Sequence, residues 1–266
     1  MSGGRRRPGW FVAATVLGLA LALAFLFLPI VGILTDVPPR ELVSRLGDGT
    51  SLDALRLSLQ TTAISLGIIV AVGTPVAYLL ATRRFRGRAL VETLLELPLV
   101  LPPAVAGIGL LAAFGPQGLL GSTLDDAGLG IALTTGGVVA AQTFVASPFY
   151  LRQAQSAFGA LDPALAEASR TLGAGEAATF ARVVVPGAAG GLVTGAALAW
   201  GRALGEFGAT LIVAGSFRGI SQTAPLAIFA SFSSDFTAAL ALSAVLLAVS
   251  GALLLGVKLL TGEAAR

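Results

Sequence analysis

The sequence contains neither cysteine nor histidine, and these two absences exclude much of enzyme chemistry. Without cysteine there is no disulfide, no thiolate nucleophile and no sulfur ligand for a metal. Without histidine the chain lacks the commonest metal ligand and the base of a Ser-His pair. The single lysine, Lys258, lies in Gly256-Val257-Lys258-Leu259, which is not a phosphate-binding loop ending in Gly-Lys-Ser/Thr. We therefore expect no catalytic residues, no metal and no nucleotide hydrolysis by this chain alone.

Charged residues are also scarce, at 12% of 266 residues, whereas soluble domains carry roughly a quarter. Hydrophobic residues make up 55% and the mean hydropathy is +0.88. Most of the chain is therefore suited to a bilayer. The isoelectric point near 10.2 is typical of nucleic-acid-binding proteins, but the formal charge is only +3 and membrane topology explains where the basic residues fall. No nucleic-acid partner is expected.

Six stretches approach or exceed the ~20 apolar residues that a helix needs to cross a bilayer. They cover residues 10–34, 57–82, 94–114, 131–151, 187–214 and 236–257. The segments between them are short, so we predict an all-α integral membrane fold with one transmembrane domain over residues 1–266. The first stretch follows arginines as a signal peptide does, but its apolar core exceeds the roughly 7–15 residues of a cleaved one. We expect it to remain as a helix.

Basic residues are concentrated in alternate segments between the predicted spans. If the amino terminus is cytoplasmic, twelve of the seventeen basic residues lie on that side: Arg5, Arg6, Arg7, Arg83, Arg84, Arg86, Arg88, Arg152, Arg170, Arg182, Lys258 and Arg266. The outer segments then hold Arg40, Arg45, Arg56 and Arg218. Because basic residues near span ends are retained in the cytoplasm, we predict that both termini are cytoplasmic. The run at 83–88 is interpreted as a topology anchor beside anionic lipid.

The cytoplasmic segment 152–186 is too polar to cross the membrane and predicts two short helices. Asp162 and Pro163 are typical of an N-cap and a first helical position, and Gly173 is typical of a helix end. Glu176 suits the first turn of a second helix. The apolar residues of the first helix recur at helical spacing: Leu165, Ala168 and Leu172. On these residues alone the segment is either a surface cap or a docking element for a soluble partner.

The same segment resembles the Glu-Ala-Ala loop of ABC-transporter permease subunits. Glu167-Ala168-Ser169, then Gly173, then Val183-x-Val185-Pro186 match the anchors of Glu-Ala-Ala-x3-Gly-x9-Ile-x-Leu-Pro, with small replacements by Ser and Val. The resemblance implies a type I importer fold with six transmembrane helices in the cell (inner) membrane. It implies that residues 152–186 form a coupling loop that docks into a separate ATPase subunit, with Gly173 at the bend. ATP and Mg would be bound by that ATPase, and this chain would carry no cofactor.

Further motifs are similar to those of oxyanion importers. Residues 97–107 resemble the proline-rich third span of molybdate permeases. Residues 203–210, in the fifth span, and 222–228, before the sixth, also resemble segments of these proteins. Sulfate and thiosulfate permeases share the Gly-Glu-Phe-Gly-Ala part of 205–209, so sulfate stays as an alternative cargo. The resemblance therefore implies import of molybdate or tungstate, an external substrate-binding protein, and a second permease copy in a homodimer.

Arg202 and Glu206 are charges within the fifth predicted span, where ionisable groups are costly and often functional. They stand four residues apart, on one helical face, and can neutralise each other. Two interpretations stay open. In the first, the pair serves only to hold the span in register with its neighbours. In the second, Arg202 adds positive potential along the transport passage for an anion, and Glu206 limits how tightly that anion binds there. The prolines at 75, 98, 102, 103 and 148 predict broken helices near a passage.

A secondary transporter or channel is the alternative class. Such a protein needs no ATPase-docking loop, and it often carries several titratable residues in mid-membrane, of which this chain has few. A membrane-embedded enzyme is disfavoured because neither a Ser-His pair nor a metal cluster can be built from these residues.

Overall fold

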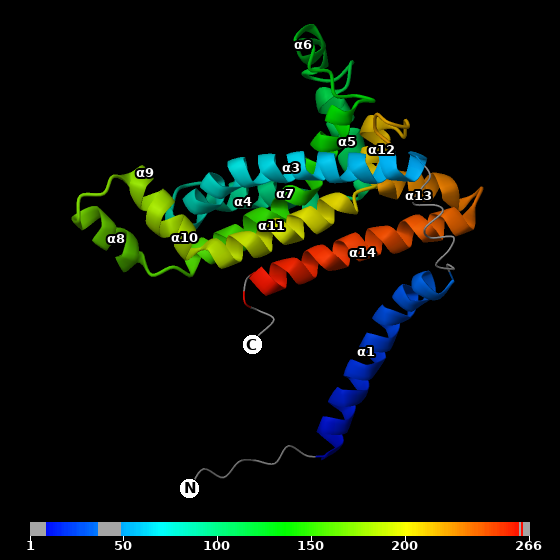
Figure 1. Ribbon diagram of the computed structural model, residues 1–266. Coiled ribbons are helices and arrows are strands. Elements are labelled where there is room, and N and C mark those ends of the chain that lie inside the picture. Colours follow the sequence, from blue (N-terminus) through cyan, green and yellow to red (C-terminus); the bar gives the residue numbers. More distant parts are fainter. Residues whose placement is uncertain (1–8, 37–48, 261, 263–266) are drawn as a thin grey trace.

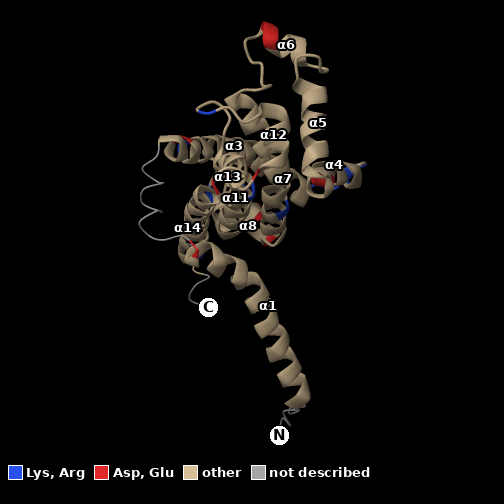
Figure 2. Ribbon diagram, turned by 90° about the vertical axis from the view of Figure 1, so that its right-hand side faces the viewer, with Lys and Arg blue, Asp and Glu red and all other residues tan. Residues whose placement is uncertain are grey.

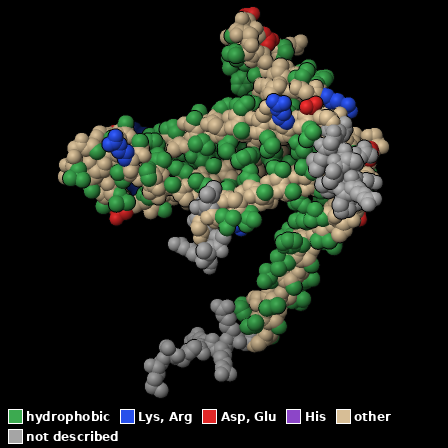
Figure 3. Space-filling view, viewed as in Figure 1, with side chains coloured by type: hydrophobic (Ala, Val, Ile, Leu, Met, Phe, Trp, Pro, Cys, Tyr) green, Lys and Arg blue, Asp and Glu red, His purple; other side chains and the backbone are tan. Residues whose placement is uncertain are grey.

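Long helices lying side by side form the body of the protein in a computed structural model that describes residues 9–36, 49–260 and 262 (Figure 1). The body contains α3 (Gly49–Thr82), α7 (Thr135–Gly159), α11 (Ala189–Leu204) and α14 (Phe236–Leu260). The first helix, α1 (Gly9–Thr35), contacts α14 and otherwise extends away from the body. Hydrophobic side chains cover the length of the body and α1 (Figure 3), as expected for surfaces that face lipid or another subunit.

Three helices in the described part of the chain, α1, α3 and α14, are long and apolar enough to cross a membrane. The number rises to five if each of two bent helix pairs counts as one span. The remaining predicted span, 131–151, corresponds to α7, which lacks a sufficiently apolar stretch. The reason is its position: α7 packs against α3, α4, α5, α11 and α12, so its polar side chains face protein instead of lipid.

A polar contact inside the α3–α7 interface illustrates this position. The Ser65 hydroxyl lies 3.2 Å from both the Val139 carbonyl and the Gln142 amide oxygen, and Gln142 Nε2 donates to Thr62 Oγ1 at 3.5 Å. Thr62, Ser65 and Gln142 are each at most 1% exposed. Buried polar groups of this kind require partners, and α7 receives them from α3.

The third predicted span, 94–114, is broken, as its prolines predicted. The chain forms α4 (Arg88–Val100) and α5 (Pro103–Phe114), which are bent by 118° relative to each other. Pro102 and Pro103 provide the reason, because proline has no N–H to continue a helical ladder and restricts the residue before it. By contrast, Pro75, Pro98 and Pro148 lie inside helices that continue past them. The α5 arm ends near α6 (Gly121–Asp126), whose acidic residues are prominent in Figure 2.

The fifth predicted span, 187–214, is also broken. Helix α11 ends at Leu204, and α12 (Gly208–Ala214) begins after three residues; α13 (Ala224–Phe232) follows before α14. The broken spans meet at two glycines. A Cβ on Gly208 would lie 2.6 Å from Cβ of Pro103, and one on Gly107 would lie 2.8 Å from Cβ of Ile212. The absence of side chains therefore brings α5 and α12 into close contact.

The predicted 152–186 loop starts later than expected, because α7 continues to Gly159. Three short helical elements follow α8 (Pro163–Thr171): α9 (Glu176–Thr179), a π-helix (Phe180–Val184) and α10 (Val185–Gly187). The run from 176 to 187 is bent by 74° relative to α11. These elements lie together at one end of the body (Figure 1).

Two neighbouring glycines of α11 allow a packing prediction. A Cβ on Gly191 would overlap Cβ of Ala157 on α7, whereas a Cβ on Gly190 meets nothing within 4 Å. We expect Gly191→Ala to destabilise the protein by about 1–3 kcal/mol through overpacking. Gly190→Ala is the matched control, expected to be neutral or to stabilise by up to about 1 kcal/mol through helix propensity. Thermal unfolding in one detergent measures both, and equal midpoints would contradict close α7–α11 contact.

Candidate functional site

The helix–bend–helix segment has capping groups at both ends of α8. The Asp162 carboxylate accepts the Ala164 amide N–H at 2.9 Å, with Pro163 at the first helical position, as predicted. At the other end Gly173 has φ +88°, one residue beyond the C-cap Leu172. Its N–H donates to the Arg170 carbonyl at 2.9 Å, and the next amide donates to the Ser169 carbonyl at 3.1 Å. These two bonds are a Schellman motif, which requires a left-handed residue at the position of Gly173.

Two side-chain contacts cross the bend and join α8 to α9. Arg170 donates from Nε and Nη2 to the two carboxylate oxygens of Glu176, at 2.7 and 3.0 Å. The hydroxyls of Ser169 and Thr179 lie 3.0 Å apart. The Arg170 hydrogen bonds lower the pKa of Glu176, with a smaller contribution from the charge of Arg83, and the same pairing raises the pKa of Arg170. Ser169, predicted as part of the coupling motif, thus has a structural role across the bend.

The Arg170–Glu176 contact predicts a pH dependence at the bend. Because the pKa of Glu176 is lowered in the folded chain, the pair contributes fully above the ordinary carboxyl value of 4.5 and is lost as pH falls below it. The cysteine-free chain accepts one spin label, at Ala177→Cys. We expect label mobility to be constant near neutral pH and to rise below 4.5. In a Glu176→Gln background the profile should be flat, and an identical rise there would assign the change to another group.

One face of α8 is exposed and apolar. Leu165 and Leu172 are 53% and 88% exposed, and Ala168 lies between them at helical spacing. The side chain of Glu167 is exposed on the same short helix. Leu165 and Leu172 thus give α8 an exposed apolar face.

The second half of the segment is anchored to the body instead. Phe180 packs against Tyr78 of α3 and Phe158 of α7, with ring centroids 4.9 and 6.3 Å apart. Thr179 and Val184 are 1% and 5% exposed. The segment therefore has one fixed part and one part that presents a free face.

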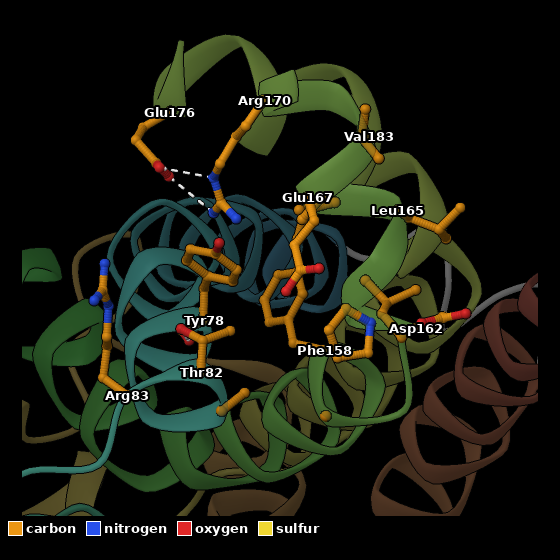
Figure 4. Close-up of a pocket in the computed structure, with 16 residues that line it drawn as sticks. Tyr78, Thr82, Arg83, Phe158, Asp162, Leu165, Glu167, Arg170, Glu176 and Val183 are labelled. Atoms are coloured by element: carbon orange, nitrogen blue, oxygen red, sulfur yellow. Dashed lines mark hydrogen bonds and ion pairs between the residues drawn. The ribbon is translucent and has the colours of Figure 1, made fainter. Parts of the chain in front are cut away.

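A cavity of about 560 Å³ separates these two parts (Figure 4). Its aromatic wall comes from Tyr78 and Phe158, and its charged lining includes Arg83, Glu167 and the Arg170–Glu176 pair. Figure 4 shows the Glu167 carboxylate directed into the cavity from α8, toward the aromatic rings. Ala166, next to Glu167, packs against the hydrophobic core, so α8 also contacts the body beside the cavity.

The sequence did not predict the π-helix in this segment. The Val185 amide donates to the Phe180 carbonyl, five residues earlier. Pro186, predicted as the last anchor of the motif, follows directly and lies in α10. Because its ring would clash with the preceding turn and it has no N–H, a wider turn accommodates it. The only sequence signal for this π-helix was Pro186, which follows a run of residues long enough to form a helix.

Arg202 and Glu206 form the predicted pair, but in a different local setting. Arg202 lies in the last turn of α11, whereas Glu206 lies in the break before α12. Glu206 is 1% exposed; its Oε1 accepts the Ala209 amide N–H at 2.9 Å, and its Oε2 lies 2.6 Å from Arg202 Nη1. The latter contact is an ion pair without the geometry of a directed hydrogen bond. Arg202 itself retains 29% side-chain exposure.

Two further ties between α4 and α7 were not anticipated. Arg152 donates to Glu96 at 2.9 Å, and Gln155 donates to Glu92 at 2.7 Å. Glu92 also accepts from Arg88 at 3.0 Å. The sequence does show two acidic residues four apart on α4 and two polar residues three apart on α7, so each set lies on one helical face. Which residues pair, however, depends on how these two helices, far apart in the sequence, pack together.

Comparison with known proteins places these features in a family. The model of the "binding-protein-dependent transport system inner membrane component" matches residues 63–260. The chain belongs to this family. The matched range contains the complete helix–bend–helix segment and the Arg202–Glu206 pair. The protein is thus a multi-pass membrane component of a transport system.

Similar relatives extend over nearly the whole chain. The molybdenum transport system permease protein ModB of Mycobacterium bovis is 39% identical over 94% of this chain and 93% of that protein. A probable molybdenum ABC transporter permease protein of Haloferax volcanii is 37% identical over 94% and 91%. A probable sulfate transport system permease protein of Chlorokybus atmophyticus is 32% identical over 89% and 86%.

The fold has a counterpart among solved structures. A bacterial alginate ABC transporter, in complex with an alginate pentasaccharide-bound periplasmic protein, matches with a TM-score of 0.74 and 15% identity. The match covers 97% of this chain and 96% of that chain. The all-α fold of type I ABC-importer permeases, predicted from the sequence, is confirmed.

Proposed function

We propose that this permease imports molybdate or tungstate as the membrane subunit of an ATP-driven transporter. The observation that carries the proposal is 39% identity to a molybdenum permease over 94% of the chain. The sulfate relative, at 32% identity over 89%, supports this cargo less strongly. The motif at 222–228 leads into α13, where the Ala224 amide donates to Ser58 Oγ of α3 at 2.7 Å. It thereby fixes the start of α13 against the body.

Energy enters through α8 in this proposal. The exposed Leu165, Ala168 and Leu172 supply the contact surface for a separate ATPase, and Gly173 sets the angle of α8. Glu167 acts from the cavity side of the same helix. The ATPase binds ATP and Mg, so the permease needs no cofactor of its own. Rotation of α8 is transmitted to α3 and α7 through the anchored Phe180.

A second copy of the chain completes the passage in this proposal. Helix α1 has no buried residue, and the arm formed by α5 and α6 projects from the body, so both offer surface to a homodimer. An extracytoplasmic binding protein delivers the anion to the end opposite α8. Helices α3, α7 and α14 all run toward the end of the body where α8 lies (Figure 1). Each of the three has basic residues near its carboxyl end or directly after it. This supports the inner membrane with both termini cytoplasmic.

The experiment is uptake into proteoliposomes containing the permease, its ATPase and ATP, with the binding protein outside. We expect ATP-dependent accumulation of molybdate, inhibited by tungstate at similar concentration and by sulfate only at much higher concentration. Omission of the binding protein is the control and should abolish uptake. Preferential accumulation of sulfate would show that the cargo is sulfate instead of molybdate. Uptake without ATP would favour a secondary transporter.

A further inference from the structure

The loop between α3 and α4 presents an unusual group of basic side chains. Arg83, Arg84 and Arg86 are exposed, as is Phe85 between them at 41%. Arg88 closes the loop and pairs with Glu92 at 3.0 Å. Within the described residues, Arg84 and Arg86 have no ion-pair partner within 4.0 Å. Two guanidinium groups and an aromatic ring are therefore exposed within three consecutive residues of this loop.

The helix that follows this loop, α4, has two unlike faces. The outer face of α4 is apolar and exposed, with Leu90 at 63%, Leu94 at 55% and Leu97 at 40%. Its other face holds Glu92 and Glu96, which bond to Gln155 and Arg152 of α7 and direct that face toward the protein. An amphipathic helix with its polar face against protein and its apolar face free is oriented toward acyl chains.

We propose that the 83–88 loop selectively binds the headgroup of anionic phospholipids. Arg84 and Arg86 would hold the lipid phosphate and the negative headgroup, because guanidinium groups bind phosphate through paired N–H donors. Phe85 would insert between the headgroups and the acyl chains, continuous with Leu90 and Leu94. A basic loop next to a membrane helix is the recognised chemistry for such lipids. This site lies outside the coupling motif and is independent of the cargo.

An acidic surface of the ATPase is the competing partner for the same arginines. The geometry favours lipid, because Leu90 and Leu94 follow the loop along a surface of membrane character, whereas the apolar face of α8 is the separate surface suited to a protein. Arg83 differs from its neighbours because it lines the cavity beneath α8 and faces Glu176. We therefore assign the lipid contact to Arg84 and Arg86 and leave Arg83 unchanged in the test.

The test uses the full chain with a fluorophore on a single Leu90→Cys, one turn from the loop, since the chain has no other cysteine. Quenching by brominated phosphatidylglycerol is compared with quenching by brominated phosphatidylcholine in nanodiscs. We expect a preference for phosphatidylglycerol of about fivefold or more, since a basic residue near an anionic surface contributes about that factor. Arg84→Gln/Arg86→Gln should lower the preference to about one.

Two further double variants make the result decisive. Arg84→Lys/Arg86→Lys retains the charge but loses the paired N–H donors, so it should keep only part of the preference. Arg56→Gln/Arg218→Gln makes the same charge change at the other end of the body and should leave the preference unchanged. Absence of a preference in the unsubstituted loop, its persistence in the double Gln variant, or its equal loss in the distant control would each overturn the proposal. The proposal would also be overturned if the double Gln variant no longer bound the ATPase in detergent but kept its lipid selectivity. That result would assign the loop to contact with the ATPase.

Discussion

Replacing Gly173 by proline is expected to reduce ATP-driven uptake by at least about tenfold while the chain still inserts into the membrane. Proline fixes φ near −65°, whereas Gly173 has φ +88°, and proline cannot donate the hydrogen bond to the Arg170 carbonyl. The bend must therefore open, which separates Arg170 from Glu176 and turns the apolar face of α8 away from its present direction. The measurements are ATPase co-purification and anion-stimulated ATP hydrolysis.

The matched control lies two residues further on. Gly175 has φ −69° and ψ 163°, values that proline adopts, and a Cβ at this position meets nothing within 4 Å. Gly175→Pro should thus retain coupling. Gly173→Ala is intermediate, because a left-handed alanine costs about 1–2 kcal/mol without losing its N–H. Retention of both ATPase association and stimulated hydrolysis by Gly173→Pro would show that the bend does not couple the subunits.

Glu167→Lys reverses a charge on the exposed helix without changing the bend. If Glu167 contributes to docking, this variant should also weaken ATPase association while leaving the caps of α8 intact. The control is the spin-label profile at Ala177→Cys, which should match that of the unsubstituted chain. A changed profile would instead indicate that the bend itself had moved.

Replacing Arg202 by glutamine is expected to have the second large effect. Glu206 is 1% exposed, so loss of Arg202 leaves a buried carboxylate without its counter-charge, which typically costs about 3–5 kcal/mol. If Arg202 also provides positive potential for a dianion, transport should fall by at least about tenfold, or ~1.4 kcal/mol in the barrier. Thermal unfolding in detergent and anion uptake measure these two effects separately.

The double variant Arg202→Gln/Glu206→Gln distinguishes the two roles. The amide that replaces the Glu206 carboxylate still offers an oxygen to the Ala209 amide N–H, and no charge is left unpaired. We expect its stability to recover toward that of the unsubstituted chain while uptake stays low. Recovery of both stability and uptake would make the pair purely structural, whereas normal uptake by the single Arg202→Gln variant would remove Arg202 from the passage.

The parts of the site that could be predicted depend on neighbouring residues. Asp162, Pro163 and Gly173 act within one helical turn of their positions, so their types alone indicate where α8 begins and ends. The Arg202–Glu206 pair is local in the same sense, since its partners stand one helical turn apart. The π-helix before Pro186 was missed because proline indicates a disturbed turn but does not say which adjustment the backbone makes.

Only the tertiary structure shows the features that depend on contacts between segments far apart in the sequence. The sequence determined a membrane protein, from its apolar runs and scarce charges, and a bend of defined length, from its capping residues. It could not determine that α7 is enclosed by other helices, that α4 and α5 diverge by 118°, or that Glu96 meets Arg152. Apolar periodicity records whether a helix buries a face but not against which helix, and a proline permits a break but does not set its direction. Packing between segments far apart in the chain sets both.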